Sequence, residues 1–362
     1  MSYPSLYMRI QHTTSVGLSF TACSYYTGDM TKNENVLFVV LNYNGWQETL
    51  TCIDAVLAQT YSPFHILLID NGSADESLEK LKKFESHKKI TFMKNPKNLG
   101  FSGGVNCGIR YALQHNFPYT VLLNNDATIS KTWLKKLVET MQKTKASIVT
   151  GLLLSSDGKK IESTGDSYSR WGLPFPRQRD EATASALSSG YVFGGTAGAS
   201  LYKTALFEEI GLFDEIFFAY YEDTDICLRA QIAGHKAYYE KSAIAYHDHG
   251  TTSSKLPGFT VMQNFKNLPL FFWKDMPLAM FPYAFFRFYG VIGLTYIRAV
   301  LRGQFAPATK GLLLSIWYFP HALKERWRIQ KSRTVSIDYL RSIMHDGLPP
   351  SNRKTVRRVF HL

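Results

Sequence analysis

Three acidic residues occur within four positions of the chain, at Glu222, Asp223 and Asp225, directly after an aromatic run. Two carboxylates held close together raise each other's proton affinity, which suits one of them to accept a proton as a general base. Arg229 follows Asp225 by four residues, a spacing that places both on one helix face, so we expect an ion pair between them. That pairing leaves Glu222 and Asp223 as the candidates for chemistry.

Polar residues also stand where predicted strands end. They are Asn42 after the apolar run 36–41, Asp70 after 65–69, and Asn124, Asn125 and Asp126 after 119–123. Because ligands of open α/β sheets bind at the carboxyl ends of the strands, we expect these side chains to border one site. Hard divalent cations take oxygen ligands, so Asp126 is a candidate to hold Mg²⁺ or Mn²⁺. Taken singly, each of these motifs also fits an ordinary turn or helix cap.

A glycine-rich segment, residues 98–106, precedes a predicted helix and contains Asn98 and Gly100. Its backbone could approach a phosphate or a sugar, and its glycines could equally serve close packing of a helix on the sheet. The spacing matches neither the dinucleotide-binding fingerprint nor a P-loop. Further along, His247 and His249 follow an apolar strand pattern, and either is a candidate metal ligand or a buried structural histidine.

The elements that must position these residues follow a regular rhythm. From residue 36 to 154, buried strand patterns alternate with helical ones. This alternation predicts an α/β fold with a mostly parallel central sheet and helices on both faces. Residues 155–190 are polar and rich in turn formers, so we expect a surface loop or lid there. The predicted units are an N-terminal extension at 1–35, an α/β domain at 36–255, an apolar helical segment at 256–335 and a basic tail at 336–362.

The composition excludes several classes of protein. With 362 residues, 45% hydrophobic and 19% charged, the chain is neither disordered nor fibrous. Its four cysteines lie far apart, which excludes a disulfide scaffold and a cysteine zinc site and suits a reducing compartment. The net charge of +12 favours anionic partners, but without a recognisable nucleic-acid-binding module we expect no nucleic acid. No nucleophile-elbow pattern supports Ser/His/Asp hydrolysis.

Much of the positive charge lies at the C-terminus. Residues 321–362 carry ten Lys and Arg against three acids, after an aromatic, apolar region at 268–323. The uncharged runs of that region are each shorter than the ~20 residues that span a bilayer. Two interpretations stay open: a segment lying in the interface of an anionic membrane, or a helical subdomain packed on the core. At the other end, residues 1–29 show no clean signal peptide and are expected to be disordered, and the functional chain could start at Met30.

Five motifs follow one another along the chain. They are Asn42-Tyr43-Asn44-Gly45-Trp46, Asp70-Asn71-Gly72-Ser73-Ala74-Asp75, Asn98-Leu99-Gly100-Phe101-Ser102-Gly103-Gly104, Asn124-Asn125-Asp126 and Tyr221-Glu222-Asp223-Thr224-Asp225. Their order resembles that of family 2 glycosyltransferases, and the chain is similar to the rhamnosyltransferase-like branch of that family. The resemblance covers residues 36–250 and implies a GT-A fold. It also implies inverting transfer of a sugar from a nucleotide-diphosphate sugar.

The resemblance assigns roles to single residues. It places Asn42 and Asp70 against the nucleotide, and Asn98, Gly100, Asn124 and Asn125 along the donor site. Asp126 matches the last acid of the family's Asp-x-Asp metal motif, whereas Asn124 stands in place of the first acid and leaves one carboxylate. Asp223 matches the catalytic base, and His247 the histidine that completes the metal or diphosphate site, with His249 as the alternative. The supporting residues are Glu222, Asp225 and Arg229.

These roles predict an inverting, metal-dependent hexosyltransferase. It would move a sugar from dTDP-rhamnose or a UDP-hexose to a hydroxyl of a glycan or lipid-linked acceptor in cell-surface polysaccharide synthesis. We expect it in the cytoplasm, peripherally attached to the inner face of the cell membrane. The alternative is a non-catalytic nucleotide-sugar-binding or scaffold protein, which Asn124 favours. A nucleotidyltransferase would need a basic, glycine-rich loop after the first strand. The segment at that place, Asn42-Tyr43-Asn44-Gly45, has no basic residue, so this class of enzyme is disfavoured.

Overall fold

The computed structural model describes residues 36–247 and 257–350. The predicted N-terminal extension, the alternative site residue His249 and residues 351–362 of the basic tail lie outside the described residues.

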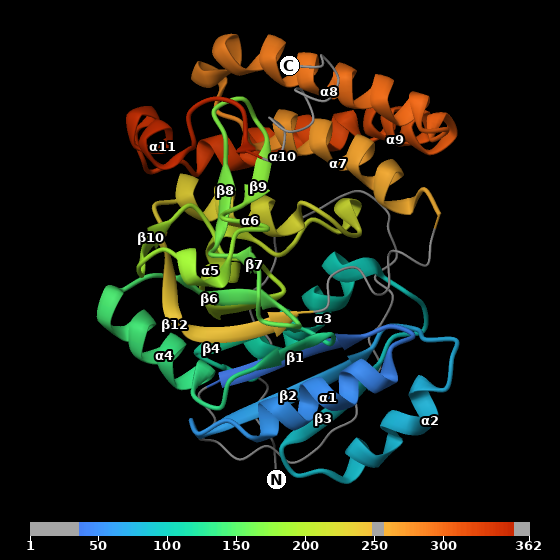
Figure 1. Cartoon of the computed structure of the whole chain (residues 1–362), viewed down its shortest axis with the longest axis vertical. Coiled ribbons are helices and arrows are strands. Elements are labelled where there is room, and N and C mark those ends of the chain that lie inside the picture. Colours follow the sequence, from blue (N-terminus) through green and yellow to red (C-terminus); the bar gives the residue numbers. More distant parts are fainter. Residues whose placement is uncertain (1–35, 248–256, 351–362) are drawn as a thin grey trace, which may run out of the picture.

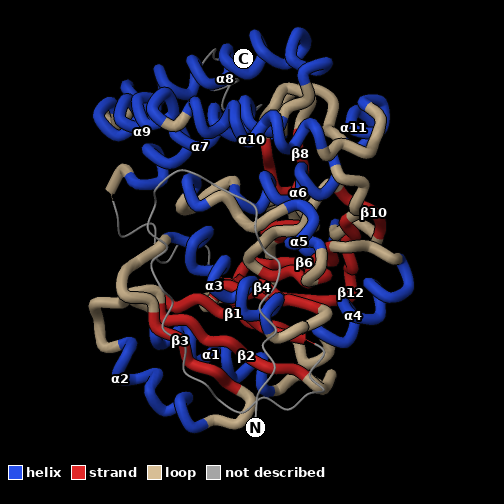
Figure 2. Tube along the Cα trace, turned by 180° about the vertical axis from the view of Figure 1, so that it is seen from behind, coloured by secondary structure: helices blue, strands red, loops and turns tan. Residues whose placement is uncertain are grey.

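A twisted sheet lies at the centre of the described part of the chain (Figures 1 and 2). Its main strand order is β10-β12-β6-β11-β4-β1-β2-β3. Short strands β5 and β7 pair with β12 and β6, and β8 pairs with β9 in a separate ribbon. The strands are β1 (Val36–Asn42), β2 (Phe64–Asp70), β3 (Ile90–Lys94), β4 (Tyr119–Asn124), β5 (Ala127–Ile129), β6 (Ile148–Ser155), β7 (Ile161–Ser163), β8 (Asp166–Tyr168), β9 (Pro174–Pro176), β10 (Gly190–Val192), β11 (Ala199–Lys203) and β12 (Ala237–His247).

The predicted α/β sheet is confirmed, but it is mixed where we expected a mostly parallel one. β1 pairs in parallel with β2 and β4, and β2 with β3, so the N-terminal half has the predicted arrangement. β11 then runs antiparallel between β4 and β6. The reason is its point of entry: the chain passes the carboxyl end of β4, where Gly198 accepts a hydrogen bond from the Asn124 N–H at 2.9 Å, and re-enters the sheet from that edge.

Helices cover both faces of the sheet, as predicted, because its central strands are buried on both sides. Val36, Phe38 and Val40 of β1 pack on one face with side chains of α1 and α4. Leu37 and Val39 point to the other face and pack with α3 and the helices that follow. The helices of this part are α1 (Trp46–Leu57), α2 (Ser77–Leu81), α3 (Gly100–Gln114), α4 (Trp133–Thr144), α5 (Leu206–Ile210) and α6 (Glu222–Ile232).

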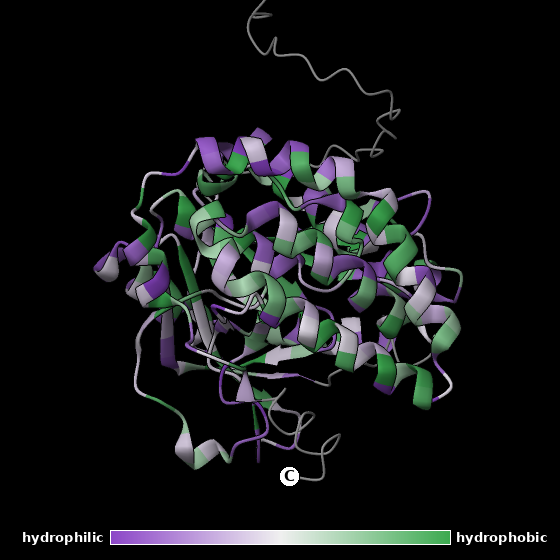
Figure 3. Ribbon diagram, turned by 90° about the horizontal axis from the view of Figure 1, so that it is seen from above, coloured by the Kyte–Doolittle hydropathy of each residue, from purple (hydrophilic) through white to green (hydrophobic). Residues whose placement is uncertain are grey.

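The C-terminal helices form a layer beyond α6, at the top of Figure 1. They are α7 (Phe259–Asp275), α8 (Phe281–Leu301), α9 (Phe305–Trp317), α10 (Phe319–Lys331) and α11 (Ile337–Ile343). Phe271 and Phe272 of α7 join the same hydrophobic core as α3 and α6, so this region packs on the α/β domain as a helical subdomain. Apolar and polar segments alternate along its helices (Figure 3). Among the described helices, the stretch Leu278–Leu301 is long and apolar enough to cross a membrane by length and composition alone.

The segment 155–190, predicted as a loop or lid, contains three short strands. β7 extends the main sheet, while the β8–β9 ribbon rises from the sheet toward the C-terminal helices (Figure 1). A bridge between Ser169 and His345 joins the ribbon to the residues after α11. The segment is therefore a wall between the sheet and the helical layer.

Candidate active site

A cavity of about 890 Å³ lies at the carboxyl edge of the sheet, where β4 and β12 end. Asn124 and His247 reach it from those strand ends, and Asp223 reaches it from the start of α6. The β7 and β8–β9 segments and the start of α7 complete its wall. Residues that the sequence separates by more than a hundred positions thus border one space, which is where ligands of α/β sheets bind. The acidic and basic lining residues are Glu162, Asp166, Arg179, Asp180, Glu181, Glu222, Asp223 and His247.

The loop that delivers Asp223 is strained. Phe218, Tyr220 and Tyr221 precede the helix with left-handed φ angles of 63°, 73° and 71°, although none is a glycine. Each such conformation costs about 1–3 kcal/mol and persists only where the surrounding structure holds it. The direction in which Asp223 enters the cavity therefore depends on contacts that this loop makes elsewhere.

Polar side chains of α7 hold the loop by its carbonyl groups. We call Gln263, Lys266 and Asn267 the α7 clamp; all three are buried. The Asn267 amide donates to three carbonyl oxygens at 3.0, 2.8 and 2.9 Å, and the Lys266 ammonium donates to one at 2.7 Å. These side-chain donors add to the loop's own hydrogen bond from the Ala219 N–H to the Phe217 carbonyl at 2.7 Å, and they help to keep its left-handed residues in place. The carbonyls bound by Asn267 and Lys266 at these distances belong to Ile216, Phe217, Ala219 and Tyr220.

The glycine-rich segment packs against the same loop. Gly100 has φ +72°, and a Cβ there would lie 2.5 Å from the carbonyl oxygen of Phe218. Gly104, one turn further along α3, would place a Cβ 2.6 Å from the side chain of Leu41. Both glycines therefore permit close approach of α3 to its neighbours, which was one of the two interpretations of this segment.

Three carboxyl groups meet in the cavity, those of Glu222, Asp223 and Asp166. Burial raises the pKa of Glu222 to about 8, and repulsion from Asp223 adds to the rise. Burial also raises the pKa of Asp223, although hydrogen bonds from the backbone N–H groups of Thr224 and Ala197 oppose the rise. For Asp166, burial and the charge of Asp223 raise the pKa well above the usual range. The cluster therefore holds protons at neutral pH.

The predicted ion pair between Asp225 and Arg229 is present, at 2.7 Å and fully enclosed. Burial alone would raise the pKa of Asp225, but Arg229 and Lys274 hold it below its usual value. Lys274 of α7 also binds Asp214 at 2.8 Å, and Asp214 binds His321 of α10 at 2.9 Å. Asp225 is thus turned away from the cavity and joins α6 to the C-terminal helices.

His247 lies between two carboxylates at the other end of the cavity. Its Nε2 is 3.0 Å from Asp126 Oδ1, and its Nδ1 is 2.8 Å from Glu162 Oε2. The Asn124 amide nitrogen lies 3.3 Å from the same Nε2. Burial lowers the pKa of His247, but the hydrogen bonds with Asp126 and Glu162 outweigh it and raise the pKa to about 9.

This arrangement fits a divalent cation in part. A metal-ligating histidine usually donates its other ring N–H to a carboxylate, as His247 does to Glu162, and this leaves Nε2 directed at Asp126. Within the described residues, no group of three or more His, Cys, Asp or Glu side chains is arranged to hold a metal by itself. Asp126 and His247 would therefore need further oxygen ligands from a bound molecule, as Mg²⁺ commonly takes from phosphates.

The other predicted donor-site residues do not line the cavity. Asn42 and Asp70 are opposite one another at the ends of β1 and β2, and the Asn42 amide donates to Asp70 Oδ1 at 2.8 Å. Asn98 accepts a hydrogen bond from the Gly100 N–H at 2.8 Å. The Asn125 amide points back to α1, where it donates to Thr49 Oγ1 at 2.9 Å. In this structure Asn42, Asp70, Asn98, Gly100 and Asn125 therefore lie beside the cavity and do not line it.

Glu162 and Asp166 are among the cavity residues that the sequence analysis missed. Both fall in the turn-rich segment 155–190, where acids are usually solvated, and no local pattern distinguishes them. Only the folding of β7 and β8 against α6 and β12 gives them their partners.

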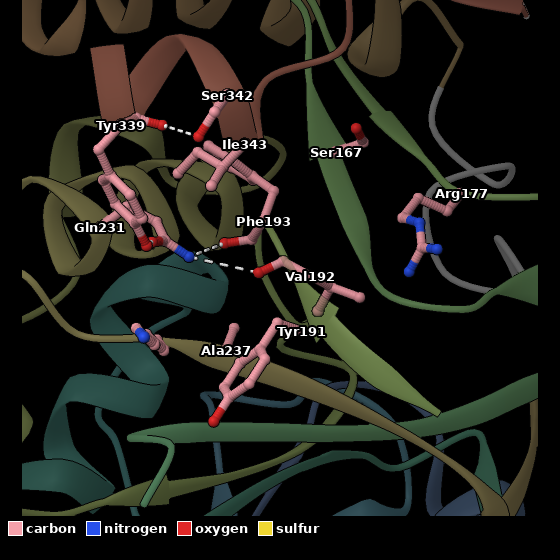
Figure 4. A pocket seen from close by; sticks show the side chains of 11 residues that line it. Ser167, Arg177, Tyr191, Val192, Phe193, Gln231, Ala237, Tyr339, Ser342 and Ile343 are labelled. Atoms are coloured by element: carbon pink, nitrogen blue, oxygen red, sulfur yellow. Dashed lines mark hydrogen bonds between the residues drawn. The ribbon is translucent and has the colours of Figure 1, made fainter. Parts of the chain in front are cut away.

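A second cavity, of about 380 Å³, contains none of the predicted site residues. Ser167 of β8, Gln231 of α6 and Tyr339 of α11 line it (Figure 4). Asp166 and Ser167, neighbours on one strand, thus face different cavities, as alternating residues of a strand do.

Comparison with known proteins decides the family. Residues 37–211 match the sequence profile described as Glycosyl transferase family 2. Residues 37–211 therefore form a family 2 glycosyltransferase domain. The chain is 26% identical over 203 residues to the low-salt glycan biosynthesis hexosyltransferase Agl10 of Haloferax volcanii; the aligned region covers 55% of this chain and 62% of Agl10. It is 24% identical over 229 residues to the dTDP-rhamnosyl transferase RfbF of Shigella flexneri, which covers 63% of this chain and 74% of RfbF.

Solved structures show the same fold. GalNAc-T7, determined with UDP, GalNAc and Mn²⁺, superimposes with a TM-score of 0.56 at 16% identity, over 84% of this chain and 57% of that one. TarS of S. aureus in complex with UDP-GlcNAc gives a TM-score of 0.51 at 13% identity, over 82% and 91%. The chain therefore has the predicted GT-A fold, and it spans less than two thirds of the length of Agl10 and of GalNAc-T7.

Proposed function

We propose that this protein is an inverting glycosyltransferase that moves a sugar from a nucleotide-diphosphate sugar to a hydroxyl group of a glycan or lipid-linked acceptor. The observation that supports the proposal is the shared cavity: Asp223 and His247 line one space of about 890 Å³, and Asp126 contacts His247 at 3.0 Å. dTDP-rhamnose is our preferred donor because RfbF is named as a dTDP-rhamnosyl transferase, and a UDP-hexose is the alternative. Cell-surface polysaccharide synthesis is the proposed setting.

The reaction is a single in-line displacement. Asp223 accepts the proton of the acceptor hydroxyl, whose oxygen forms a bond to the anomeric carbon. The bond from that carbon to the diphosphate oxygen breaks, and the nucleoside diphosphate leaves with the electron pair. Glu222 is the weaker candidate for the base, because its pKa of about 8 keeps it mostly neutral at pH 7, whereas backbone donors favour the ionised form of Asp223.

Asp126 and His247 would hold the divalent cation, Mg²⁺ or Mn²⁺, with Glu162 orienting the imidazole. When bound, such a cation supplies positive charge beside the diphosphate, where negative charge grows as the bond breaks. Asn124 adds an amide to this end of the cavity, within 3.3 Å of His247.

Replacing Asp223 tests the proposal. General-base catalysis contributes about 10²–10⁴-fold, so Asp223→Asn should lower the transfer rate by that factor. Donor binding, followed by the shift in melting temperature with each nucleotide sugar, should be nearly unchanged, because the amide keeps the shape of the side chain. A variant that transfers sugar at the wild-type rate would refute the role of Asp223, and donor binding without transfer by the wild type would favour the scaffold alternative.

A further inference from the structure

We propose that the second cavity, of about 380 Å³, is a binding site for a small organic anion: a molecule about the size of a monosaccharide that carries one carboxylate or phosphate group. Ser167, Arg177 and Lys236 are the lining residues that would bind its anionic group. The inference does not depend on the proposed function, because Asp223, Asp126 and His247 do not line this cavity.

The cavity lies where the α/β domain meets the C-terminal helices. Figure 4 shows Ser167 and Arg177 on one side of it, and Gln231 of α6 and Tyr339 of α11 on the other. Small-molecule sites are frequent at such junctions between structural units. The cavity is separate from the first one, of about 890 Å³, because Arg177 lines the second cavity whereas Arg179, two residues later, lines the first.

The polar groups of the wall around α6 and α11 are already paired with each other. The Tyr339 hydroxyl donates to Gln231 Oε1 at 2.7 Å, and the Gln231 amide donates to the Phe193 carbonyl at 2.8 Å. The Ser342 hydroxyl donates to the carbonyl oxygen of Tyr339 at 2.7 Å. This wall is therefore formed before any ligand arrives, and its donors are used within the protein.

The opposite wall carries donors that lack acceptors. Ser167 is 8% exposed, and its hydroxyl group has no hydrogen-bond partner among the described residues. The half-buried Arg177 guanidinium donates from Nη1 to the Thr164 carbonyl at 2.9 Å, and within residues 36–247 and 257–350 its Nε and Nη2 have no acceptor. Because donors in folded proteins are rarely left unpaired, these groups indicate a bound molecule that accepts hydrogen bonds.

The charge of the cavity favours an anion over a neutral molecule or water. Arg177 and Lys236 are its charged lining residues, and no carboxylate side chain lines it. In the part of the chain that the structure describes, neither cation forms an ion pair. The Lys236 ammonium group lies 5.2 Å from the centre of the Tyr191 ring, another lining residue. A guanidinium group binds a carboxylate or a phosphate through two parallel hydrogen bonds, so Arg177 suits either group.

The rest of the lining favours an organic molecule over a bare ion. Val192, Phe193, Ala237 and Ile343 border the cavity together with the Tyr191 ring. Tyr191 is 58% exposed, so a ligand that covers its ring removes apolar surface from water. A bare phosphate ion would use the donors and leave this surface exposed. The ligand that fits both walls therefore joins an anionic group to a compact body, as a sugar acid or a sugar phosphate does.

The probes are glucose 6-phosphate and glucuronate, with glucose and inorganic phosphate for comparison. Titration calorimetry of the purified full chain should show that at least one anionic sugar binds about tenfold or more tightly than glucose and than inorganic phosphate. The preferred anionic sugar then identifies the group as a phosphate or a carboxylate. Arg177→Gln should weaken its binding about tenfold or more, and Ser167→Ala about 3- to 10-fold. Arg179→Gln, which removes a charge from the first cavity, is the matched control and should bind the probe as the wild type does.

Three results would overturn the proposal. The first is that the wild type binds neither anionic sugar at concentrations up to about 10 mM. The second is that glucose or inorganic phosphate binds as tightly as the anionic sugars. The third is that Arg179→Gln weakens binding as much as Arg177→Gln while both variants melt as the wild type does, because the probe is then not held by the second cavity. A wild type that binds the probe in this cavity but transfers no sugar contradicts the proposed function alone.

Discussion

At the scale of single residues, the cavity has two chemically different ends. One end holds acids that burial keeps partly protonated, around Asp223, and the other holds a histidine between the carboxylates of Asp126 and Glu162. A sugar transfer needs both functions, a base for the acceptor and positive charge for the leaving group. With Asn124 in place of the family's first acid, Asp126 is the carboxylate that we propose as the metal ligand beside His247.

Asp126 is therefore where metal dependence should be most sensitive. Asp126→Ala removes the carboxylate that faces His247, so donor binding should lose most of its enhancement by Mn²⁺, about 10-fold or more. Titration calorimetry of the nucleotide sugar with and without Mn²⁺ measures this directly. Donor binding that keeps its wild-type metal dependence would contradict the assignment, and Asp157→Asn, an exposed acid after β6, is the control.

Glu222 predicts a pH-dependent stability. Its pKa is raised from 4.5 to about 8 in the folded protein, so the folded state binds this proton more tightly than the unfolded state does. The stabilisation is complete below pH 4.5 and is lost as the pH rises through 8. Glu222→Gln stays neutral, so relative to the wild type it should gain stability with rising pH, on the order of a few kcal/mol by pH 9. Urea unfolding at pH 6 and 9 tests this; equal differences at both pH values, or the same gain in the exposed Glu208→Gln, would contradict it.

At the scale of elements, the sequence predicts best those strands whose apolar residues form a continuous local run. The strands from β1 to β4 are apolar runs buried on both faces, and they were found within one or two residues of their observed ends. β11 was missed because five residues carry little pattern, and its direction depends on where the preceding loop crosses the sheet. Asp223 and His247 were predicted for the site because their motifs are local, and both line the cavity, whereas Asp126 does not line it but contacts His247. Glu162 and the α7 clamp were not predicted, because their partners lie at least 44 residues away in the sequence.

The α7 clamp makes α7 part of the active site without touching substrate. Asn267→Leu keeps the volume but removes one donor from each of three loop carbonyls, of which those of Phe217 and Ala219 keep the Gln263 amide, so stability should fall by about 1–3 kcal/mol. Because the same carbonyls precede Asp223, kcat should fall as well, while KM for the donor changes little. Thermal unfolding and kinetics of the purified full chain measure both. A loss of stability with an unchanged kcat would show that the clamp supports the fold only; Gln142→Leu, exposed on α4, is the control.

At the scale of the whole molecule, the C-terminal layer has two faces. The inner face carries the α7 clamp and the network of Asp214, Lys274 and His321, which tie it to α6. The outer face exposes large apolar side chains, among them Trp317 at 78% and Trp327 at 69%. The others that are at least half exposed on α8, α9 and the turn before α8 are Leu278, Phe286, Ile297, Leu301, Phe305, Leu313 and Ile316. Lys and Arg residues are interspersed, as in helices that lie in an anionic membrane interface.

We infer that this outer face rests on the inner surface of the cell membrane, which would bring a lipid-linked acceptor to the cavity. A tryptophan moved from water into the interface contributes roughly 1.5–3 kcal/mol, so Trp317→Ser and Trp327→Ser should each weaken binding to anionic liposomes about tenfold or more. The control is Tyr191→Ser: this aromatic at the edge of the sheet is 58% exposed, and the variant should bind as the wild type does. Cosedimentation with vesicles of anionic and of neutral lipid separates the apolar from the electrostatic contribution, because only the latter weakens with salt. If the full-length protein binds neither kind of vesicle, the proposed contact of the outer face with a membrane is refuted. Sugar transfer to a soluble acceptor would still be expected, because the cavity lies on the other side of the α7 clamp.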